Sequence, residues 1–345
     1  MRKILVLGYF GYNSNQLDGQ TVKTRDVYRL TTEQVNGING IIDFYDTEDF
    51  QYHKMSIFRM FWKVIKCNIL FYLPAHNNLK IIFPIIYCLS LIFRFKIHYF
   101  VVGGWLREFI EPLPVHKYML AQISGIHVET KRLKDDLEAH FHYKNVDIFP
   151  NFRFFENLTY KPKNHSDILK IVFVSRVEQS KGLDTLLEVY NFFKKTDNLK
   201  YFTLDIYGQK KDNFFDNNLN NIEFFNYKGV LEPNQVISTL KQYDVLIFPS
   251  HYEGEGCPGI LIEAMAAGLP IIASNWKYNN EFVEDGVNGF LCATYDALSF
   301  YKAIIELHKN KQLLNQMSLS SFNKSKFYSE SSARLLLNKF FKIYN

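Results

Sequence analysis

The stretch from His251 to Pro270 reads HYEGEGCPGILIEAMAAGLP, and its character changes once along its length. The first half holds Gly, Pro and acidic residues that favour a loop, and the second half is an apolar run of helix formers. Pro258 suits the first turn of a helix, and Gly268 suits the position just after its end. The stretch therefore predicts a loop followed by a helix from about Gly259 to Ala267. The positive end of that helix points back toward the loop, which favours a phosphate there.

Two carboxylates flank the predicted helix start: Glu255 in the loop and Glu263 inside the helix. Each can accept two hydrogen bonds from a vicinal diol, so the pair suits one sugar and one ribose. Glu263 stands in an apolar helix, where a charge is rarely buried without a partner. We interpret both as ligand-binding residues. The alternative is that they are exposed surface charges.

Short β-rich runs alternate with helical stretches on both sides of this segment. In the second half of the chain the predicted strands are 169–175, 202–207, 222–225, 245–248 and 270–274. In the first half they are 3–8, 40–45, 69–73, 97–102, 125–128 and 146–149. A polar stretch at 160–167 interrupts the alternation and reads as a linker. The pattern predicts an α/β protein with two Rossmann-like, doubly wound domains facing each other across a ligand cleft.

The predicted domain boundaries follow from that linker. The first domain covers 1–160 and the second 168–325, and a final helical segment, 326–345, is expected to pack back toward the first domain. A chain of 345 residues is long enough for two cores of this size.

Two cations follow the first strand of the second half. Arg176 directly follows the predicted strand 169–175, and Lys181 directly precedes Gly182, where the next helix begins. Both side chains can neutralise a diphosphate leaving group as charge develops on it. In the first half, Asp18 is the predicted cap of a helix from about Gln20, and Gly19 lets backbone approach a phosphate. The sequence lacks the GxGxxG motif that is typical of dinucleotide-binding hydride-transfer enzymes, which argues against that class.

Residues 51–100 carry the positive excess of the chain, since they contain seven Lys or Arg and no Asp or Glu. Arg59, Lys63 and Lys66 fall on one face of an amphipathic helix, which suits an anionic lipid surface. A core helix with a solvated basic edge remains the open alternative. The apolar run 81–93, interrupted by Pro84, is shorter than the roughly 20 residues that span a bilayer.

The remaining composition excludes several classes of site. Four scattered cysteines indicate neither a zinc site nor a disulfide framework, and they fit a reducing cytoplasm. No aromatic and basic pattern of a nucleic-acid module occurs. The acidic residues between Asp43 and Asp49 form no DxD pair and are interpreted as a solvated strand end.

Three motifs together resemble retaining glycosyltransferase family four, which has the GT-B fold: residues 175–182, 255–270 and 284–291. The resemblance implies transfer of a sugar from a nucleotide-diphosphate sugar to a glycan or lipid-linked acceptor. Uridine diphosphate is the expected carrier, with guanosine diphosphate as the alternative. The segment 252–259, followed by 274–281, is similar to the branch that assembles bacterial surface polysaccharide, capsule or exopolysaccharide.

The resemblance also implies roles for single residues. Arg176 and Lys181 hold the donor diphosphate, Glu263 the ribose and Glu255 the transferred sugar, and Arg176, Lys181 and Glu255 are the expected catalytic residues. Further expected donor contacts are Gly19, Gln20, Gly208, Lys228, Gly229, Gly256, Cys257, Pro258, Gly259 and Ile260. No metal and no cofactor are expected, and the enzyme is expected in the cytoplasm, peripheral on the inner face of the cell membrane.

One departure concerns a histidine that many relatives carry after a strand of the first domain. Here 101–105, Val-Val-Gly-Gly-Trp, occupies that place, and neither His76 nor His98 matches it in position. Trp105 is a candidate to shape the acceptor side instead. Two other classes remain open: a sugar-nucleotide epimerase of GT-B-like fold, and a non-catalytic scaffold that binds a sugar nucleotide.

Overall fold

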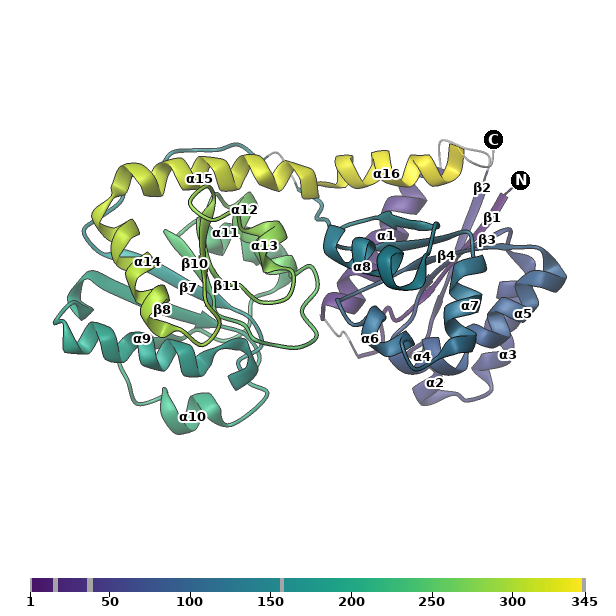
Figure 1. Cartoon of the computed structure of the whole chain (residues 1–345), viewed down its shortest axis with the longest axis horizontal. Coiled ribbons are helices and arrows are strands. Elements are labelled where there is room, and N and C mark those ends of the chain that lie inside the picture. The colour runs from purple at the N-terminus through teal and green to yellow at the C-terminus, as the bar shows by residue number, and fades with distance from the viewer. Residues whose placement is uncertain (1, 15–17, 36–39, 156–157, 343–345) are drawn as a thin grey trace. The chain divides into compact units, whose positions relative to one another are not determined.

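The computed structural model describes residues 2–14, 18–35, 40–155 and 158–342, and the chain divides into two compact units (Figure 1). The first unit comprises Met1–Phe152 and Glu330–Asn345, and the second comprises Arg153–Ser329. Each unit contains one six-stranded sheet whose neighbouring strands are parallel. The predicted α/β class with two doubly wound sheets is therefore confirmed.

The sheet of the first unit has the order β2-β1-β3-β4-β5-β6. Its strands are β1 (Arg2–Gly8), β2 (Gly40–Asp46), β3 (Ile69–Leu73), β4 (Lys96–Phe100), β5 (Gly125–Val128) and β6 (Val146–Ile148). Its helices are α1 (Gly19–Val35), α2 (Asp49–Tyr52), α3 (Ser56–Lys66), α4 (His76–Ile81), α5 (Phe83–Phe93), α6 (Leu106–Ile110), α7 (Pro114–Gln122), α8 (Lys131–Phe141) and α16 (Glu330–Lys342). All of β3 and β5 is buried, as expected of parallel strands covered on both faces.

The sheet of the second unit has the order β12-β11-β10-β7-β8-β9. Its strands are β7 (Leu169–Val174), β8 (Phe202–Tyr207), β9 (Phe225–Tyr227), β10 (Val245–Phe248), β11 (Ile271–Ser274) and β12 (Gly289–Cys292). Its helices are α9 (Leu183–Lys195), α10 (Phe214–Asn218), α11 (Val236–Leu240), α12 (Gly259–Ala266), α13 (Asn279–Phe282), α14 (Ala297–Lys309) and α15 (Lys311–Ser325). The strand order reverses between β7 and β10, and ligands of such sheets bind beyond the carboxyl ends of the strands at that switch point.

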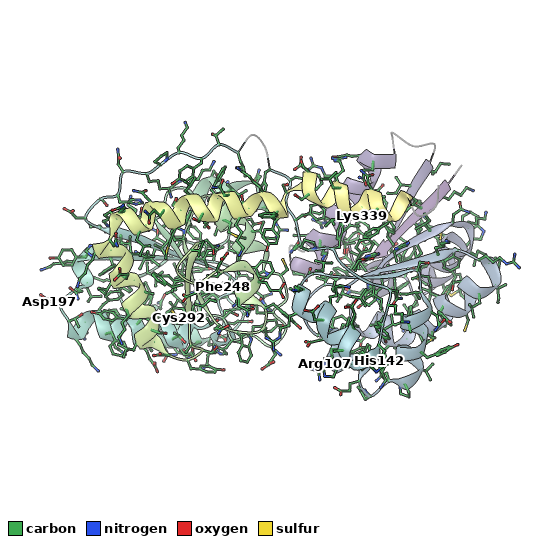
Figure 2. All side chains as sticks on the ribbon, turned by 45° about the horizontal axis from the view of Figure 1, so that its top comes forward. Arg107, His142, Asp197, Phe248, Cys292 and Lys339 are labelled. Atoms are coloured by element: carbon green, nitrogen blue, oxygen red, sulfur yellow. The ribbon has the colours of Figure 1, made fainter. Side chains whose placement is uncertain are left out.

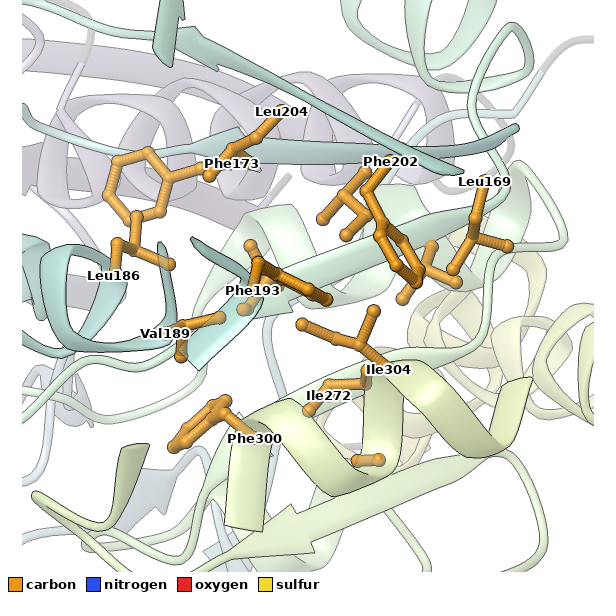
Figure 3. Packing of buried hydrophobic residues seen from close by; sticks show 14 of the residues in the cluster. Leu169, Phe173, Leu186, Val189, Phe193, Phe202, Leu204, Ile272, Phe300 and Ile304 are labelled. Carbon is orange, nitrogen blue, oxygen red and sulfur yellow. The ribbon is translucent and has the colours of Figure 1, made fainter. Parts of the chain in front are cut away.

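The core of the second unit shows how the apolar patterns fix these positions. Leu186, Val189 and Phe193 of α9, with Phe300 and Ile304 of α14, pack against the buried face of the sheet (Figure 3). These side chains recur at helical spacing, so each helix places one stripe on the sheet. The sheet is thereby held rigid below the loops that leave its carboxyl edge.

The α16 helix belongs to the first unit although it closes the chain. The Gln34 amide of α1 donates to Arg334 O over 2.9 Å, and Arg334 pairs with Glu33 at 2.6 Å. The side chain of Phe340 is buried against His127, with 4.0 Å between ring centroids.

Three local predictions need correction. The strand predicted at 222–225 lies at Phe225–Tyr227, because the chain turns from Leu219 to Phe225 through i to i+3 hydrogen bonds. Pro84 does not interrupt a helix: it lies in the first turn of α5, where its missing amide costs no hydrogen bond. The strand β12, which ends at Cys292 (Figure 2), was not predicted, since its four residues lie inside a turn-rich motif.

Candidate functional site

The loops that follow β7 and β10 meet at the switch point of the second unit. The His251 amide donates to Ser180 O over 3.0 Å, so the two loops are joined by a backbone hydrogen bond. Gly182 has φ +88°, and a Cβ there would lie 2.3 Å from Pro249 O. Only glycine fits this close approach in a left-handed conformation. The contact brings the cations after β7 beside the carboxylate after β10.

Lys181 and Glu255 form an ion pair at the centre of this loop cluster. Only 6% of each residue is exposed, and Ser250 Oγ donates a further hydrogen bond of 2.8 Å to Glu255 Oε1. A buried carboxylate loses solvation, and partners such as these offset that loss. The structure thus brings the predicted diphosphate cation and the predicted sugar carboxylate into direct contact.

Arg176 is the exposed cation of the cluster. Its side chain is 40% exposed, and Nη2 lies 3.2 Å from Glu178 Oε1. Its guanidinium carbon lies 4.6 Å from the ring centroid of Tyr252, and Lys181 Nζ lies 4.2 Å from the same centroid. The ring of Tyr252 therefore contacts both cations through its π-face. Sequence reasoning missed Tyr252, although it stands inside the deciding stretch.

Glu263 is held by a residue that sequence reasoning also missed. Arg153 Nε lies 2.7 Å from Glu263 Oε1, and the two side chains are 14% and 17% exposed. Neither Glu263 nor Glu255 is an exposed surface charge, so that alternative is wrong for both. Glu253 is exposed and pairs with Lys277 at 2.8 Å.

The start of α12 differs in one detail from the prediction. Pro258 has φ −64° and ψ 119°, so it is the extended residue before the helix, and Gly259 is the first helical residue. Pro258, the N-cap residue, makes no side-chain hydrogen bond to the first turn, and Gly256 and Cys257 are buried in front of it. Gly268 closes the helix as predicted, with φ +71° and its amide donating to Met265 O over 2.9 Å.

Three of the expected donor contacts, Gly208, Lys228 and Gly229, lie at the carboxyl ends of β8 and β9, on the same sheet edge as Arg176. The Gly208 amide donates to Gly229 O over 2.8 Å, and a Cβ on Gly208 would lie 1.6 Å from Ser175 O. Lys228 Nζ lies 3.9 Å from Asp205 Oδ2, and its side chain is 45% exposed. The second unit therefore gathers Gly208, Lys228 and Gly229 at the edge of the sheet that carries Arg176.

The expected donor contacts of the first unit stand at the start of α1. Asp18 caps the helix as predicted, because its Oδ1 accepts a hydrogen bond from the Thr21 amide over 2.9 Å. A Cβ on Gly19 would meet no atom within 4 Å. Gln20 donates its side-chain amide to Leu73 O over 3.0 Å, so it fixes α1 to the end of β3.

The acidic residues at the end of β2 form a solvated strand end only in part, because Asp43 is exposed. Asp46 and Glu48 are buried, and they accept backbone amides of Phe10 at 2.9 Å and Asn13 at 2.8 Å. Burial raises the pKa of Glu48, but hydrogen bonds from Ser14 and Asn13 outweigh it and leave the pKa below its usual value. The segment shapes the loop after β1. Among the described residues, no group of three or more His, Cys, Asp or Glu side chains could hold a metal ion.

The two histidines weighed in place of the family's histidine have different surroundings. His98 lies within β4, and its Nδ1 is 2.9 Å from Nε2 of buried His127. Burial lowers the pKa of His98 to about 4, so it is a neutral core residue. His76 begins α4 and stacks on Trp105 with 3.7 Å between ring centroids.

A buried ion pair, which sequence reasoning missed, supports the 101–105 segment. Lys23 Nζ lies 2.7 Å from Glu129 Oε1, and Glu129 Oε2 accepts the Gly103 amide over 3.0 Å. Trp105 donates its ring N–H to Val102 O over 2.7 Å. The segment before Trp105 is thus fixed from inside the first unit.

The three cations of the basic helix α3 have different surroundings. Lys63 pairs with Asp43 at 2.7 Å and is only 15% exposed, so it faces β2. Arg59 and Lys66 are exposed beside Phe58 and Trp62, which are 65% and 56% exposed. On the adjoining helix α5, Ile85, Leu91, Ile92 and Phe93 are also exposed. None of the described helices is long and apolar enough to cross a membrane.

The two parallel six-stranded sheets give the chain the GT-B fold. Anabaena HepE, solved with UDP and glucose, matches with a TM-score of 0.75 over 99% of this chain and 100% of that chain, at 13% identity. Residues 156–323 match the family model of glycosyl transferases group 1. This match lies within the second unit and covers just under half of the chain.

Two curated relatives show where the sequence similarity lies. A poly(ribitol-phosphate) α-N-acetylglucosaminyltransferase of Staphylococcus aureus (strain COL) is 28% identical over 230 residues, 65% of this chain and 44% of that relative. An Escherichia coli UDP-Gal:α-D-GlcNAc-diphosphoundecaprenol α-1,3-galactosyltransferase is 38% identical over 91 residues, 26% of this chain and 23% of that relative. The aligned parts span less than half the length of either relative.

Proposed function

We propose that this chain is a retaining glycosyltransferase that moves a sugar from a uridine-diphosphate sugar to a glycan or lipid-linked acceptor in bacterial surface-polysaccharide synthesis. The observation that carries the proposal is the loop cluster of the second unit. There, Arg176, Lys181 and Glu255 gather at the switch point of a sheet whose sequence matches the group 1 glycosyltransferases. One curated relative is named as a UDP-galactose transferase, and one structural neighbour was solved with UDP and glucose. Both support uridine diphosphate as the nucleotide carrier.

In this proposal the donor lies along the carboxyl edge of the second sheet. Its diphosphate binds the amides of the first turn of α12 and the guanidinium of Arg176. The ribose hydroxyls donate to the carboxylate of Glu263, and the hydroxyls of the transferred sugar donate to the carboxylate of Glu255. Lys181 stays with Glu255 and adds positive charge beside the leaving group. Helix amides and fixed cations stabilise charge in a site of low dielectric without solvent reorganisation. We therefore propose transfer without a divalent metal or a cofactor, the nucleotide sugar being a substrate.

The proposed reaction exchanges one bond at the anomeric carbon. The bond from that carbon to the diphosphate oxygen breaks, and a bond to the acceptor oxygen forms on the same face of the sugar. The acceptor hydroxyl loses its proton to the departing phosphate. Arg176 and the start of α12 neutralise the charge that grows on the diphosphate during this exchange.

Release of UDP tests the proposal against its alternatives. The chain would be incubated with a panel of UDP sugars and with polyprenol-linked or glycan acceptors, and free UDP and product configuration would be followed. A transferase releases UDP only with an acceptor and retains the anomeric configuration. An epimerase would change the sugar without releasing UDP, and a scaffold would bind without turnover.

We also propose that the enzyme works as a peripheral protein on the cytoplasmic face of the cell membrane, with α3 and α5 against anionic lipid. Exposed aromatic and aliphatic side chains next to Arg59 and Lys66 support this, because such faces enter the headgroup region while their cations meet phosphates. Lys63 is left out of this face because it pairs with Asp43.

Co-sedimentation with vesicles of anionic lipid tests the membrane proposal. Changing Arg59 and Lys66 to Gln should release most of the bound protein, since each cation near the surface contributes about 1 kcal/mol. Changing Lys194 and Lys195 to Gln is the matched control, because both are exposed on α9 of the second unit. Equal binding by both double variants would refute the assignment of this face.

A further inference from the structure

Arg153 is fixed at the first position of the second unit. Its backbone amide donates to Tyr328 O over 2.9 Å, and it forms a parallel bridge with Ser329. The backbone is therefore anchored to the last residues of the same unit. From this anchor the side chain reaches the start of α12, and only 14% of it is exposed.

The guanidinium makes two close approaches at α12. Its Nε lies 2.7 Å from Glu263 Oε1, and a Cβ on Gly259 would lie 1.7 Å from its Nη2. Nη2 thus occupies the side-chain position of Gly259, and Nε contacts the carboxylate one turn later. The hydrogen bonds of the described residues leave Oε2 of Glu263 open.

Glu263 needs such a partner to act as a ligand. It lies in an apolar helix with 17% of its side chain exposed, where an unpaired carboxylate would lose much of its solvation. A free Glu side chain also samples several rotamers, and a binding group held in one rotamer loses less entropy when a ligand arrives. A cation on Oε1 offsets the lost solvation of the carboxylate and leaves Oε2 for another donor.

We infer that Arg153 is a positioning residue of the donor site: it holds the Glu263 carboxylate in the orientation that accepts the ribose hydroxyls of the nucleotide. The inference rests on the proposed function, because it takes Glu263 as the ribose ligand. It assigns Arg153 no contact with the reacting atoms. Its effect is on nucleotide affinity and acts through Glu263.

A double-mutant cycle measured by calorimetry tests this coupling. UDP and 2′,3′-dideoxy-UDP would be titrated into the wild type, Arg153→Met, Glu263→Gln and the double variant. Each single change should raise the Kd for UDP by about 10-fold, the value of one charged hydrogen bond, and the double change should raise it no further. The dideoxy analogue lacks the two ribose hydroxyls that donate to Glu263 in this proposal, so it should bind all four proteins with nearly equal affinity.

Two further variants separate positioning from folding. Lys194→Met removes an exposed cation of the same unit and should leave the Kd for UDP unchanged. Arg153→Lys keeps the charge but not the planar fork, so it should restore part of the affinity and remains usable if Arg153→Met fails to fold. Thermal melting without nucleotide checks the fold of each protein.

Three results would overturn the inference while leaving the proposed function intact: an unchanged Kd in Arg153→Met, a tighter Kd in that variant, or losses that multiply in the double variant. Failure of the folded wild type to bind any nucleoside diphosphate would overturn the proposed function and the inference together.

Discussion

Lys181 and Glu255 neutralise each other inside the loop cluster, so a change in either has two separable effects. Lys181→Met leaves a carboxylate of 6% exposure without its cation and should lower the free energy of unfolding by about 3 to 5 kcal/mol. Lys181→Met with Glu255→Gln removes both charges and should recover most of that loss. Urea unfolding measures both, with Lys228→Met as the exposed control. Equal stability of the single and double variants would contradict the buried pair.

Arg176 is half-exposed, so its removal should affect turnover far more than stability. Arg176→Ala should lower kcat by about 100-fold, because a cation aimed at the leaving diphosphate is lost. Steady-state release of UDP measures this, and urea unfolding of the same variant serves as the control. An unchanged kcat would place the diphosphate elsewhere.

The site residues that sequence could predict are those with a local signal. Arg176 and Lys181 follow a predicted strand, and Glu255 and Glu263 flank a predicted helix start. Arg153 gives no such signal, because it is 110 positions from Glu263 and joins it only through the fold. The pairing of Lys181 with Glu255 was equally hidden, since it depends on two loops 74 positions apart.

The turns at the carboxyl ends of β7, β8 and β9 depend on glycine for two different reasons. Gly208 has φ +141°, and a Cβ would meet the Ser175 carbonyl oxygen at 1.6 Å, whereas Gly229 has φ +83° with open space around it. Gly208→Ala should therefore displace the Ser175–Arg176 turn and destabilise the unit by several times the cost of Gly229→Ala. The latter pays only the left-handed penalty of about 1 to 2 kcal/mol. Chemical unfolding of both variants measures the two losses of stability. Equal losses would contradict the close approach of Gly208 to the Ser175 carbonyl.

Strands that stand between clear turn signals were predicted well, and two strands that adjoin turn-rich segments were not. β7, β8 and β10 lie within a residue of their predicted bounds because each is a mostly apolar run rich in β-branched and aromatic residues. β9 was misplaced and β12 was missed because turn-forming residues adjoin both strands. α5 shows the opposite error, since a helix-starting proline was interpreted as a break.

Acid stability of the first unit should depend on the His98–His127 pair. Burial lowers the pKa of His98 to about 4 and that of His127 well below its usual value, and Lys23 adds to the effect at His127. The unfolded chain therefore binds more protons than the folded one between about pH 6.5 and pH 4. The pair's contribution to stability is complete above pH 6.5 and is lost as pH falls through that window.

Urea unfolding near pH 7 and near pH 5 measures this loss. The wild type should lose more stability than His98→Phe/His127→Phe, by at most about 1.4 kcal/mol per pH unit for each histidine. Carboxylates with lowered pKa, such as Glu48, contribute only in a more acidic range. An equal pH dependence in both proteins would contradict the neutral buried pair.

The alternation of strands and helices was enough to predict two doubly wound sheets, because each βα unit carries its own pattern. The boundaries 1–160 and 168–325 remain predictions of independent folding. The structure groups Glu330–Asn345 with the first unit through contacts such as Gln34 with Arg334. Such contacts span 300 positions, so no local pattern predicts their register.

The central claim is that the second unit holds a nucleoside diphosphate against α12 and Arg176 without a metal. Calorimetric titration of UDP and of GDP into the wild type and Glu263→Ala, each with and without EDTA, tests it most directly. We expect the wild type to bind UDP more tightly than GDP and to keep the same affinity in EDTA, and we expect Glu263→Ala to weaken UDP binding about 10-fold. A folded wild type that binds neither nucleotide, or binds only with a divalent ion, would contradict it.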